Sequence, residues 1–194
     1  MSLSTRVKSF IGLAGALAGI ATLLITLALA LPSQYSVPAG GVRSDANGFA
    51  IEWIVTSGGA QVVSESGGAA VGTWKQGLFS GSSILSGSGR YAEGSVEHIW
   101  VLLRDRYGRY YLQYPPAELS GPRWDMANIR VGREIAAIEF WGVDGTGNSI
   151  LQRLADGMIS SGNWPGLSKR DLPDRYSDLG SIALLYRRGF PYVF

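Results

Sequence analysis

The sequence predicts a mainly β protein, an immunoglobulin-like antiparallel β-sandwich with one short satellite helix, preceded by a single transmembrane helix. Residues 10–31 form an uncharged apolar run, and a later segment has helical periodicity. Between them, about seven to nine short β-branched and aromatic segments alternate with Gly- and Pro-rich turns. We divide the 194 residues into a cytoplasmic leader (1–9), a transmembrane helix (10–31), a tether (32–48) and one extracytoplasmic β domain (49–194).

The apolar run FIGLAGALAGIATLLITLALAL, residues 10–31, is long enough to span a bilayer. A helix over this run measures about 33 Å, against a hydrocarbon core of about 30 Å. Gly12, Gly15 and Gly19 give this helix a face of small residues, on which a second helix can pack closely.

The alternative for this run is a cleaved signal peptide, with the cut after Ala28-Leu29-Ala30. The run is longer than the roughly 7 to 15 apolar residues of a typical signal peptide, and Pro32 crowds the cut. We therefore expect a retained anchor.

Charge places the β domain outside the cell. Arg6 and Lys8 precede the apolar run and the first charge after it is Arg43, and basic flanks stay cytoplasmic. The rest of the chain carries equal numbers of basic and acidic residues, so we expect no nucleic-acid surface.

The chain has no cysteine, which excludes disulfides and thiolate chemistry and favours a bacterial or archaeal envelope protein.

The first half of the β domain is predicted from turn residues and β-branched segments. Residues 32–47 are rich in Pro, Gly and Ser and are expected to be an extended tether. Strands are expected at residues 49–56, 61–63 and 69–75. The Gly-rich residues 77–94 are expected to be turn or mobile loop, with a brief strand at 83–85.

The second half contains the clearest strand pattern. Residues 96–104 and 109–114 flank a turn with Gly108 and are predicted to form an antiparallel hairpin. Along residues 96–104, apolar side chains occupy both odd-numbered and even-numbered positions. Both faces of this strand are therefore expected to be covered. Further strands are expected at 124–131, 135–143 and 181–188, and a helix at 150–159, capped by Asn148 or Ser149 and packed on the sheet.

The residues of this second half resemble a known pattern. Its parts are His98-Ile99-Trp100-Val101, Gly108-Arg109-Tyr110-Tyr111-Leu112-Gln113, Arg123-Trp124, Gly132 and Ile138-Glu139-Phe140. Together they resemble an uncharacterised extracytoplasmic β-sandwich module of bacterial proteins, over about residues 96–143. The turn Gly121-Pro122-Arg123-Trp124 has one residue more than that pattern. The resemblance implies a fold and a bacterial origin, and no activity.

No catalytic or metal-binding pattern is present. His98 is the only histidine, and no G-x-S-x-G motif accompanies it. Glu134 and Glu139 are separated by an odd number of residues, so along one strand they face opposite ways. Residues 144–148, DGTGN, have the oxygen side chains of a calcium loop, but a strand-to-helix turn with a cap explains them better. We expect no enzyme activity, no cofactor and no metal.

The binding candidates are aromatic and basic residues. Trp53, Trp100 and Trp141 lie in strong strand patterns and are expected in the core. Trp74, Trp124 and Trp164 lie near turns and are candidates for the surface, where aromatic rings stack on sugars or on a partner's side chains. The hairpin contributes a cluster of residue types enriched at binding hot spots, namely Arg104, Arg106, Tyr107, Arg109 and Tyr110; the alternative for this cluster is a solvated turn.

These observations favour a non-catalytic, single-pass membrane protein of the cell envelope. Its N-terminus is expected in the cytoplasm, and its outer domain is expected to bind a membrane-protein partner or a second copy, as a subunit or accessory of a larger complex. The alternative is an envelope domain that binds carbohydrate or another ligand, secreted after cleavage of the signal peptide.

Overall fold

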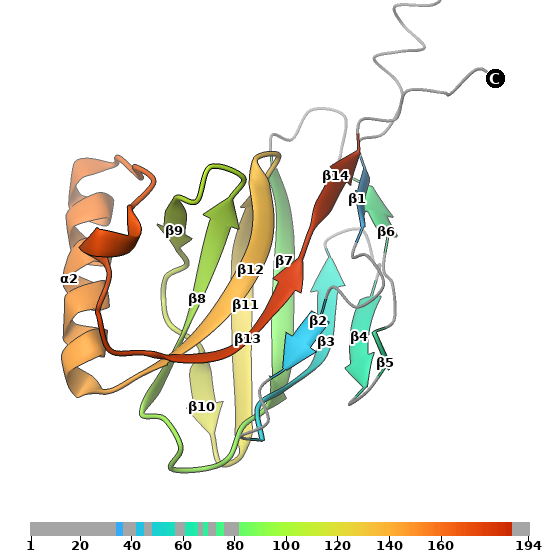
Figure 1. Ribbon diagram of the computed structural model, residues 1–194, viewed down its shortest axis with the longest axis horizontal. Helices are drawn as coiled ribbons and strands as arrows, with labels where there is room; N and C mark the ends of the chain where they lie inside the picture. Colours follow the sequence, from blue (N-terminus) through green and yellow to red (C-terminus); the bar gives the residue numbers. More distant parts are fainter. Residues whose placement is uncertain are drawn as a thin grey trace, which may run out of the picture.

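The structure is a computed structural model and describes residues 34–36, 42–44, 48–56, 61–65, 68–69, 73–75 and 82–187. It is mainly β, and its two large antiparallel sheets and one α-helix, within these residues, are consistent with the expected β-sandwich (Figure 1). No helix in the described part of the chain has the length and apolar character needed to cross a membrane. The predicted span, with Gly12, Gly15 and Gly19, lies outside the described residues.

The larger sheet has six strands in the order β10-β11-β7-β3-β4-β5. Their bounds are Glu118–Ser120 for β10, Arg123–Gly132 for β11, Ser82–Arg90 for β7, Ala50–Thr56 for β3, Gln61–Glu65 for β4 and Gly68–Ala69 for β5. The predicted strands 49–56, 61–63 and 124–131 are therefore confirmed. Residues 82–90 were expected to be mainly loop and instead form a long strand between β3 and β11, so that prediction was wrong.

The second sheet has five strands in the order β2-β13-β12-β8-β9. Their bounds are Val42–Ser44 for β2, Ser177–Ala183 for β13, Ile135–Val143 for β12, His98–Asp105 for β8 and Tyr110–Leu112 for β9. The predicted hairpin is confirmed, since β8 pairs with β9 from Leu102 opposite Leu112 to Arg104 opposite Tyr110.

A small third sheet has the order β14-β1-β6, formed by Leu185–Arg187, Gln34–Ser36 and Thr73–Lys75. Strands β1 and β2 both come from the segment that was expected to be a tether. The β domain therefore begins earlier in the chain than predicted, and residues 34–36 and 42–44 are part of its sheets.

Two hydrophobic clusters cover the two faces of the second sheet. Ile99, Val101 and Leu103 of β8 belong to the cluster between the large sheets. Trp100 and Leu102 belong to a second cluster under the helix. The expectation that both faces of this strand are covered is confirmed.

Helix α2 (Gly145–Ser161) forms the outer layer over the second cluster, with Leu151, Ala155 and Met158 buried. It begins at Gly145 rather than at residue 150 because Asp144 is its N-cap, with Oδ1 accepting a 2.7 Å hydrogen bond from Gly147 N. The predicted caps, Asn148 and Ser149, were therefore wrong. A 3-10 turn, η1 (Lys169–Asp171), follows the helix and leads back to β13.

Candidate functional site

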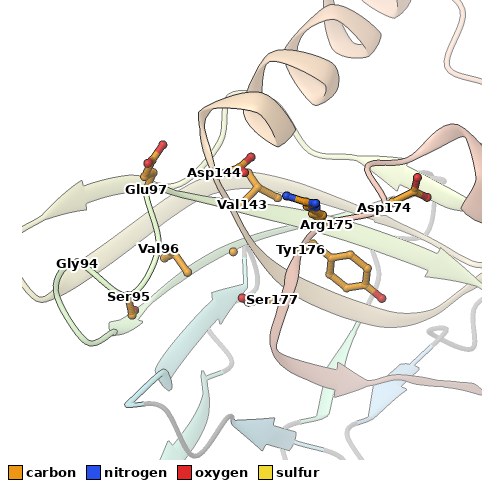
Figure 2. A pocket seen from close by; sticks show the side chains of 11 residues that line it. Gly94, Ser95, Val96, Glu97, Val143, Asp144, Asp174, Arg175, Tyr176 and Ser177 are labelled. Carbon is orange, nitrogen blue, oxygen red and sulfur yellow. The ribbon is translucent and has the colours of Figure 1, made fainter.

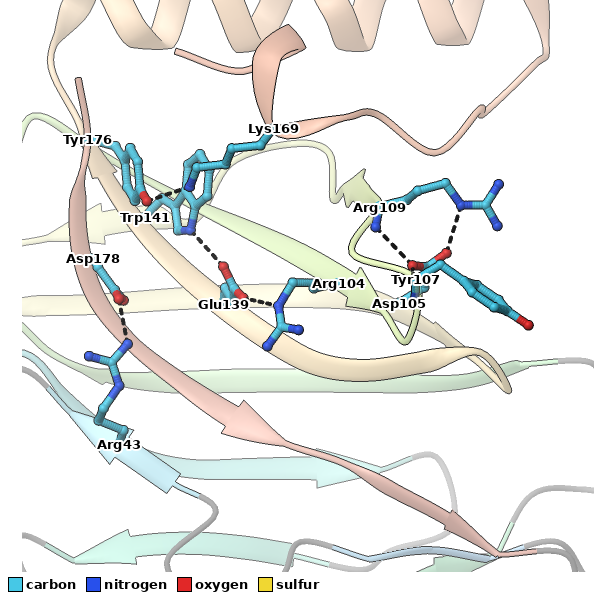
Figure 3. A network of polar contacts seen from close by, with 10 residues as sticks. All are labelled: Arg43, Arg104, Asp105, Tyr107, Arg109, Glu139, Trp141, Lys169, Tyr176 and Asp178. Atoms are coloured by element: carbon cyan, nitrogen blue, oxygen red, sulfur yellow. Dashed lines mark hydrogen bonds and ion pairs between the residues drawn. The ribbon is translucent and has the colours of Figure 1, made fainter. Parts of the chain in front are cut away.

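The carboxylate of Asp105 organises the tip of the β8–β9 hairpin. Asp105 is fully buried, and its Oδ1 accepts hydrogen bonds from the backbone N–H groups of Tyr107 at 2.8 Å and Arg109 at 2.9 Å. Its Oδ2 accepts a 3.0 Å hydrogen bond from Arg109 Nε (Figure 3). The same oxygen accepts a 3.2 Å hydrogen bond from the Tyr111 hydroxyl. Burial by itself raises the pKa of Asp105, but the hydrogen bonds from Arg109 and Tyr107 outweigh it and hold the pKa below its ordinary value.

The tip therefore presents an ordered aromatic ring between two cations. Tyr107 is 68% exposed, and the guanidinium carbons of Arg106 and Arg109 each lie 5.7 Å from the centre of its ring. Arg106 also forms a salt bridge with Glu134 in the turn between β11 and β12.

The other two residues of the predicted cluster face the helix instead. Arg104 lies opposite Tyr110 in the ladder, and its Nε forms a 2.5 Å salt bridge with Glu139 Oε1. Glu139 Oε2 accepts a 3.2 Å hydrogen bond from Trp141 Nε1. Tyr110 belongs to the hydrophobic cluster on the helix-facing side of the second sheet, and Arg104 is paired with Glu139 beside it. The predicted binding cluster is therefore divided between this side and the hairpin tip.

Trp141 is the centre of an aromatic cluster on this helix-facing side. Its ring stacks on Tyr176 at 3.8 Å and lies 5.6 Å from Tyr110. The ammonium group of Lys169 lies 4.2 Å from the centre of the Trp141 ring and donates a 2.5 Å hydrogen bond to the Tyr176 hydroxyl (Figure 3). Burial raises the pKa of Tyr110. The expectation that Trp100 and Trp141 lie in the core is confirmed, and the side chain of Trp53 is outside the described part.

The main concave surface beside the hairpin is a groove of about 800 Å³, called here the Trp164 groove. It lies between β9, the β11–β12 turn and the end of α2. Tyr114, Ile159 and Trp164 line it and are 39%, 49% and 41% exposed, respectively. Large side chains exposed together in one concave surface are typical of binding sites.

The polar lining of the Trp164 groove is basic. Arg130 and Arg133 line it, and neither forms a salt bridge with any described residue. Its acidic residue, Glu134, is already paired with Arg106. Gln113 fixes one wall, because its Oε1 accepts a 2.8 Å hydrogen bond from Arg130 N across the gap between β9 and β11.

Of the tryptophans expected at the surface, only Trp164 is shown to be there. Trp124 is fully buried, so its prediction as a surface residue was wrong. It stacks on Phe49 at 5.5 Å between the two sheets, and its Nε1 donates to Ala50 O at 3.2 Å. Trp74 lies in β6, and its side chain is outside the described part.

Sequence reasoning missed four residues of the Trp164 groove: Tyr114, Ile159, Arg130 and Arg133. Ile159 ends the helix predicted at 150–159, whose apolar residues were expected to pack on the sheet, but Met158 is buried there and Ile159 is exposed. Along β11, Ile129 and Val131 are buried and Arg130 between them is exposed. Because successive side chains of a strand point to opposite faces, the sequence alone could have predicted that Arg130 points outward. Nothing in the sequence places Arg133 beside Trp164.

A second cleft, of about 480 Å³, lies at the start of α2 (Figure 2). Glu97, Asp144, Asp174 and Arg175 line it. Residues 144–148 form the strand-to-helix turn that was expected, with the Asp144 carboxylate as the cap in place of Asn148 or Ser149. Among the described residues, no group of three or more Asp, Glu or His side chains is placed to hold a metal ion.

The carboxylates considered for catalysis lie in separate ion pairs. Glu134 binds Arg106 in the β11–β12 turn, and Glu139 binds Arg104 on the helix-facing side. His98 is at the start of β8 and is partly exposed.

Comparison of the chain with protein-family models, with curated proteins and with solved structures gives no match. The resemblance of residues 96–143 to a bacterial β-sandwich module and the immunoglobulin-like assignment both stay predictions.

Proposed function

We propose that the β domain acts by binding, and that the Trp164 groove receives a segment of a partner protein within a larger membrane assembly. The observation that carries this proposal is the gathering of Tyr114, Ile159 and Trp164, three exposed large side chains, in one groove. Large aromatic side chains in concave surfaces contribute most of the free energy at many protein interfaces.

The charges of the groove select the chemistry of the partner. Arg130 and Arg133 favour a segment that carries carboxylates beside an apolar or aromatic side chain. The apolar side chain would cover Ile159 and Trp164, and the carboxylates would pair with the two arginines. Arg106, Tyr107 and Arg109 of the hairpin tip lie next to this groove through the Arg106–Glu134 salt bridge and would form part of the rim.

The membrane setting rests on the sequence. The apolar residues 10–31, with Arg6 and Lys8 before them, support a single-pass protein with its N-terminus in the cytoplasm and the β domain in the periplasm or outside the cell. A helix bearing Gly12, Gly15 and Gly19 would pack against a helix of the partner.

Native mass spectrometry of the chain, extracted from its own membranes in mild detergent, tests the proposal. We expect the full-length chain inside a complex, and we expect Trp164→Ala to reduce the fraction in complex about 10-fold or more. Leu185→Ala is the matched control, because Leu185 is 44% exposed and lies in β14 of the third sheet, not in the lining of the groove. Charge reversal at Arg130 and Arg133 together should have the same effect as Trp164→Ala.

Three results would contradict the proposal. The wild-type chain could be found free of partners, or the Trp164 and Leu185 variants could lose partners equally. The domain could also be retained on an immobilised glycan through Trp164 and Tyr114, which would favour the carbohydrate-binding alternative. A chain that begins near residue 31 would show a cleaved signal peptide.

A further inference from the structure

A row of oxygen-bearing side chains crosses the six-stranded sheet on its outer face. Strands β10, β11 and β7 are neighbours in this sheet (Figure 1). In the ladder, Glu118 of β10 lies opposite Asp125 of β11, and Asp125 lies opposite Ser88 of β7. Directly opposite residues of antiparallel strands point to the same face. All three line one cleft of about 470 Å³, called here the Ser88 cleft.

The hydroxyl group of Ser88 has no hydrogen-bond partner among the described residues. Ser88 is 7% exposed, and its Oγ is buried without a hydrogen bond to any described residue. A buried hydroxyl without a hydrogen bond destabilises the fold, and such groups are rare in folded proteins. A ligand that donates a hydrogen bond at the base of the cleft would satisfy it.

Among the described residues, the two carboxylates also have no salt-bridge partner. Neither Glu118 nor Asp125 forms a salt bridge with a described residue, although like charges directly opposite on a sheet are unfavourable. In the adjacent outward-facing pair, Arg123 of β11 opposite Arg90 of β7, both arginines form salt bridges with the single carboxylate of Glu52. The two arginines therefore have an acidic partner within the sheet, whereas Glu118 and Asp125 have no basic partner among the described residues.

We propose that the Ser88 cleft binds an organic cation, a guanidinium or primary ammonium group. Such a group has only hydrogen-bond donors, and they would reach the carboxylates of Glu118 and Asp125 and the Oγ of Ser88. The cleft is also lined by Pro115 and Pro116, which offer apolar walls to the carbon part of such a ligand. The volume lies within the range of sites for small organic groups, about 300 to 1,000 Å³.

This chemistry fits better than a bare calcium ion. Calcium takes about six to eight oxygen ligands, and the row supplies two carboxylates and one hydroxyl. The inference uses residues outside the Trp164 groove, so it stands or fails independently of the proposed function.

Binding of methylguanidinium and of n-butylamine to the full chain in mild detergent, followed by isothermal titration calorimetry, tests the proposal. We expect saturable binding that weakens about 10-fold in Ser88→Ala and at least as much in Asp125→Asn. Asp156→Asn is the control, since Asp156 is exposed on α2. Tetramethylammonium has the same charge without an N–H group and should bind more weakly than methylguanidinium.

The thermal midpoint of the same Ser88→Ala variant gives a second readout in the opposite direction. Without a ligand, the temperature at the midpoint of unfolding should be unchanged or raised, because the substitution removes a buried hydroxyl that has no hydrogen bond to a described residue.

An acetylated arginine peptide tests the source of the cation. Tighter binding than methylguanidinium indicates a side chain of a partner, and equal binding indicates a free small molecule; either supports the site.

Four results would overturn the proposal. These are absence of probe binding, equal binding of tetramethylammonium, displacement of the probe by calcium, and a lowered thermal midpoint in Ser88→Ala. The last result would show that the hydroxyl already has a structural partner.

Discussion

At the scale of single residues, Asp105 shows how one buried charge orders an exposed turn. Four donors converge on its carboxylate, two from the backbone of the turn and two from the side chains of Arg109 and Tyr111. Because these donors hold the turn, Tyr107 has a fixed position between two arginines. The rigidity of the hairpin tip therefore depends on a residue that is itself inaccessible.

The lowered pKa of Asp105 predicts a loss of stability in acid. A carboxyl group whose pKa is lowered in the folded state stabilises that state above its unfolded pKa of about 4. That contribution declines as the pH falls from about 4 through the lower folded value. We expect Asp105→Asn to reduce the free energy of unfolding at pH 7 by about 3 kcal/mol.

Chemical denaturation of the full chain at a series of pH values measures both effects. The wild-type chain should lose stability in acid more steeply than Asp105→Asn, and Asp156→Asn should follow the wild type. Identical acid profiles for the wild type and Asp105→Asn would contradict the assigned role.

At the scale of elements, strand β7 shows which parts of the fold can be predicted from sequence patterns and which cannot. Strands β8 and β12 are rich in aliphatic and aromatic residues and were predicted from that composition. Strand β7 contains the residues SSILSGSGR, whose glycines are typical of loops. Gly89 is needed there because the Trp124 ring and Ala50 O lie against its Cα, a contact made in three dimensions that local sequence does not encode.

The same contact predicts that one added methyl group at position 89 strongly destabilises the fold. A Cβ at position 89 would lie 1.9 Å from Ala50 O and 2.7 Å from Trp124 Nε1. Gly89→Ala must displace β3 or Trp124, and we expect it to lower the free energy of unfolding by about 3 kcal/mol or more. Gly132→Ala in β11 is the control, because a Cβ there meets no atom within 4 Å.

Equilibrium denaturation of the two variants in mild detergent measures the difference. The Gly132 variant should stay within about 1 kcal/mol of the wild type. Comparable stability of both variants would mean that Trp124 does not occupy the space above Gly89.

The candidate binding residues also fall into those that residue type predicted correctly as exposed and those that it did not. Trp164 and the exposed part of the hairpin were predicted from residue type, because aromatic residues and arginine near turns are typical of interfaces. Trp124 has the same residue type and a similar turn beside it, but the inward direction of its side chain in β11 places it between the sheets. Residue type thus identified candidates, and strand register decided between them.

At the scale of the whole molecule, the small third sheet fixes where the chain would meet the membrane. Gln34 of β1 lies opposite Arg187 at the end of β14 and opposite Lys75 of β6. Only Pro32 and Ser33 separate β1 from the end of the proposed span. At about 3.5 Å per residue, this link reaches about 10 Å. The third sheet would therefore lie next to the bilayer. Helix α2 lies on the opposite side of the domain in Figure 1 and would face away from the bilayer.

This arrangement predicts that the residues after Arg187, RGFPYVF, contact the lipid headgroups. The chain leaves β14 beside the proposed membrane entry point, and aromatic and basic residues are favoured at membrane interfaces. Because the chain has no cysteine, a single Gly189→Cys substitution can carry an environment-sensitive fluorophore, with Arg153→Cys on exposed α2 as the control. In proteoliposomes, we expect blue-shifted emission and quenching by spin-labelled lipids at position 189 and neither at position 153. Equal behaviour at both positions would show that the third sheet does not face the bilayer, and would place the Trp164 groove in a different orientation toward its partner.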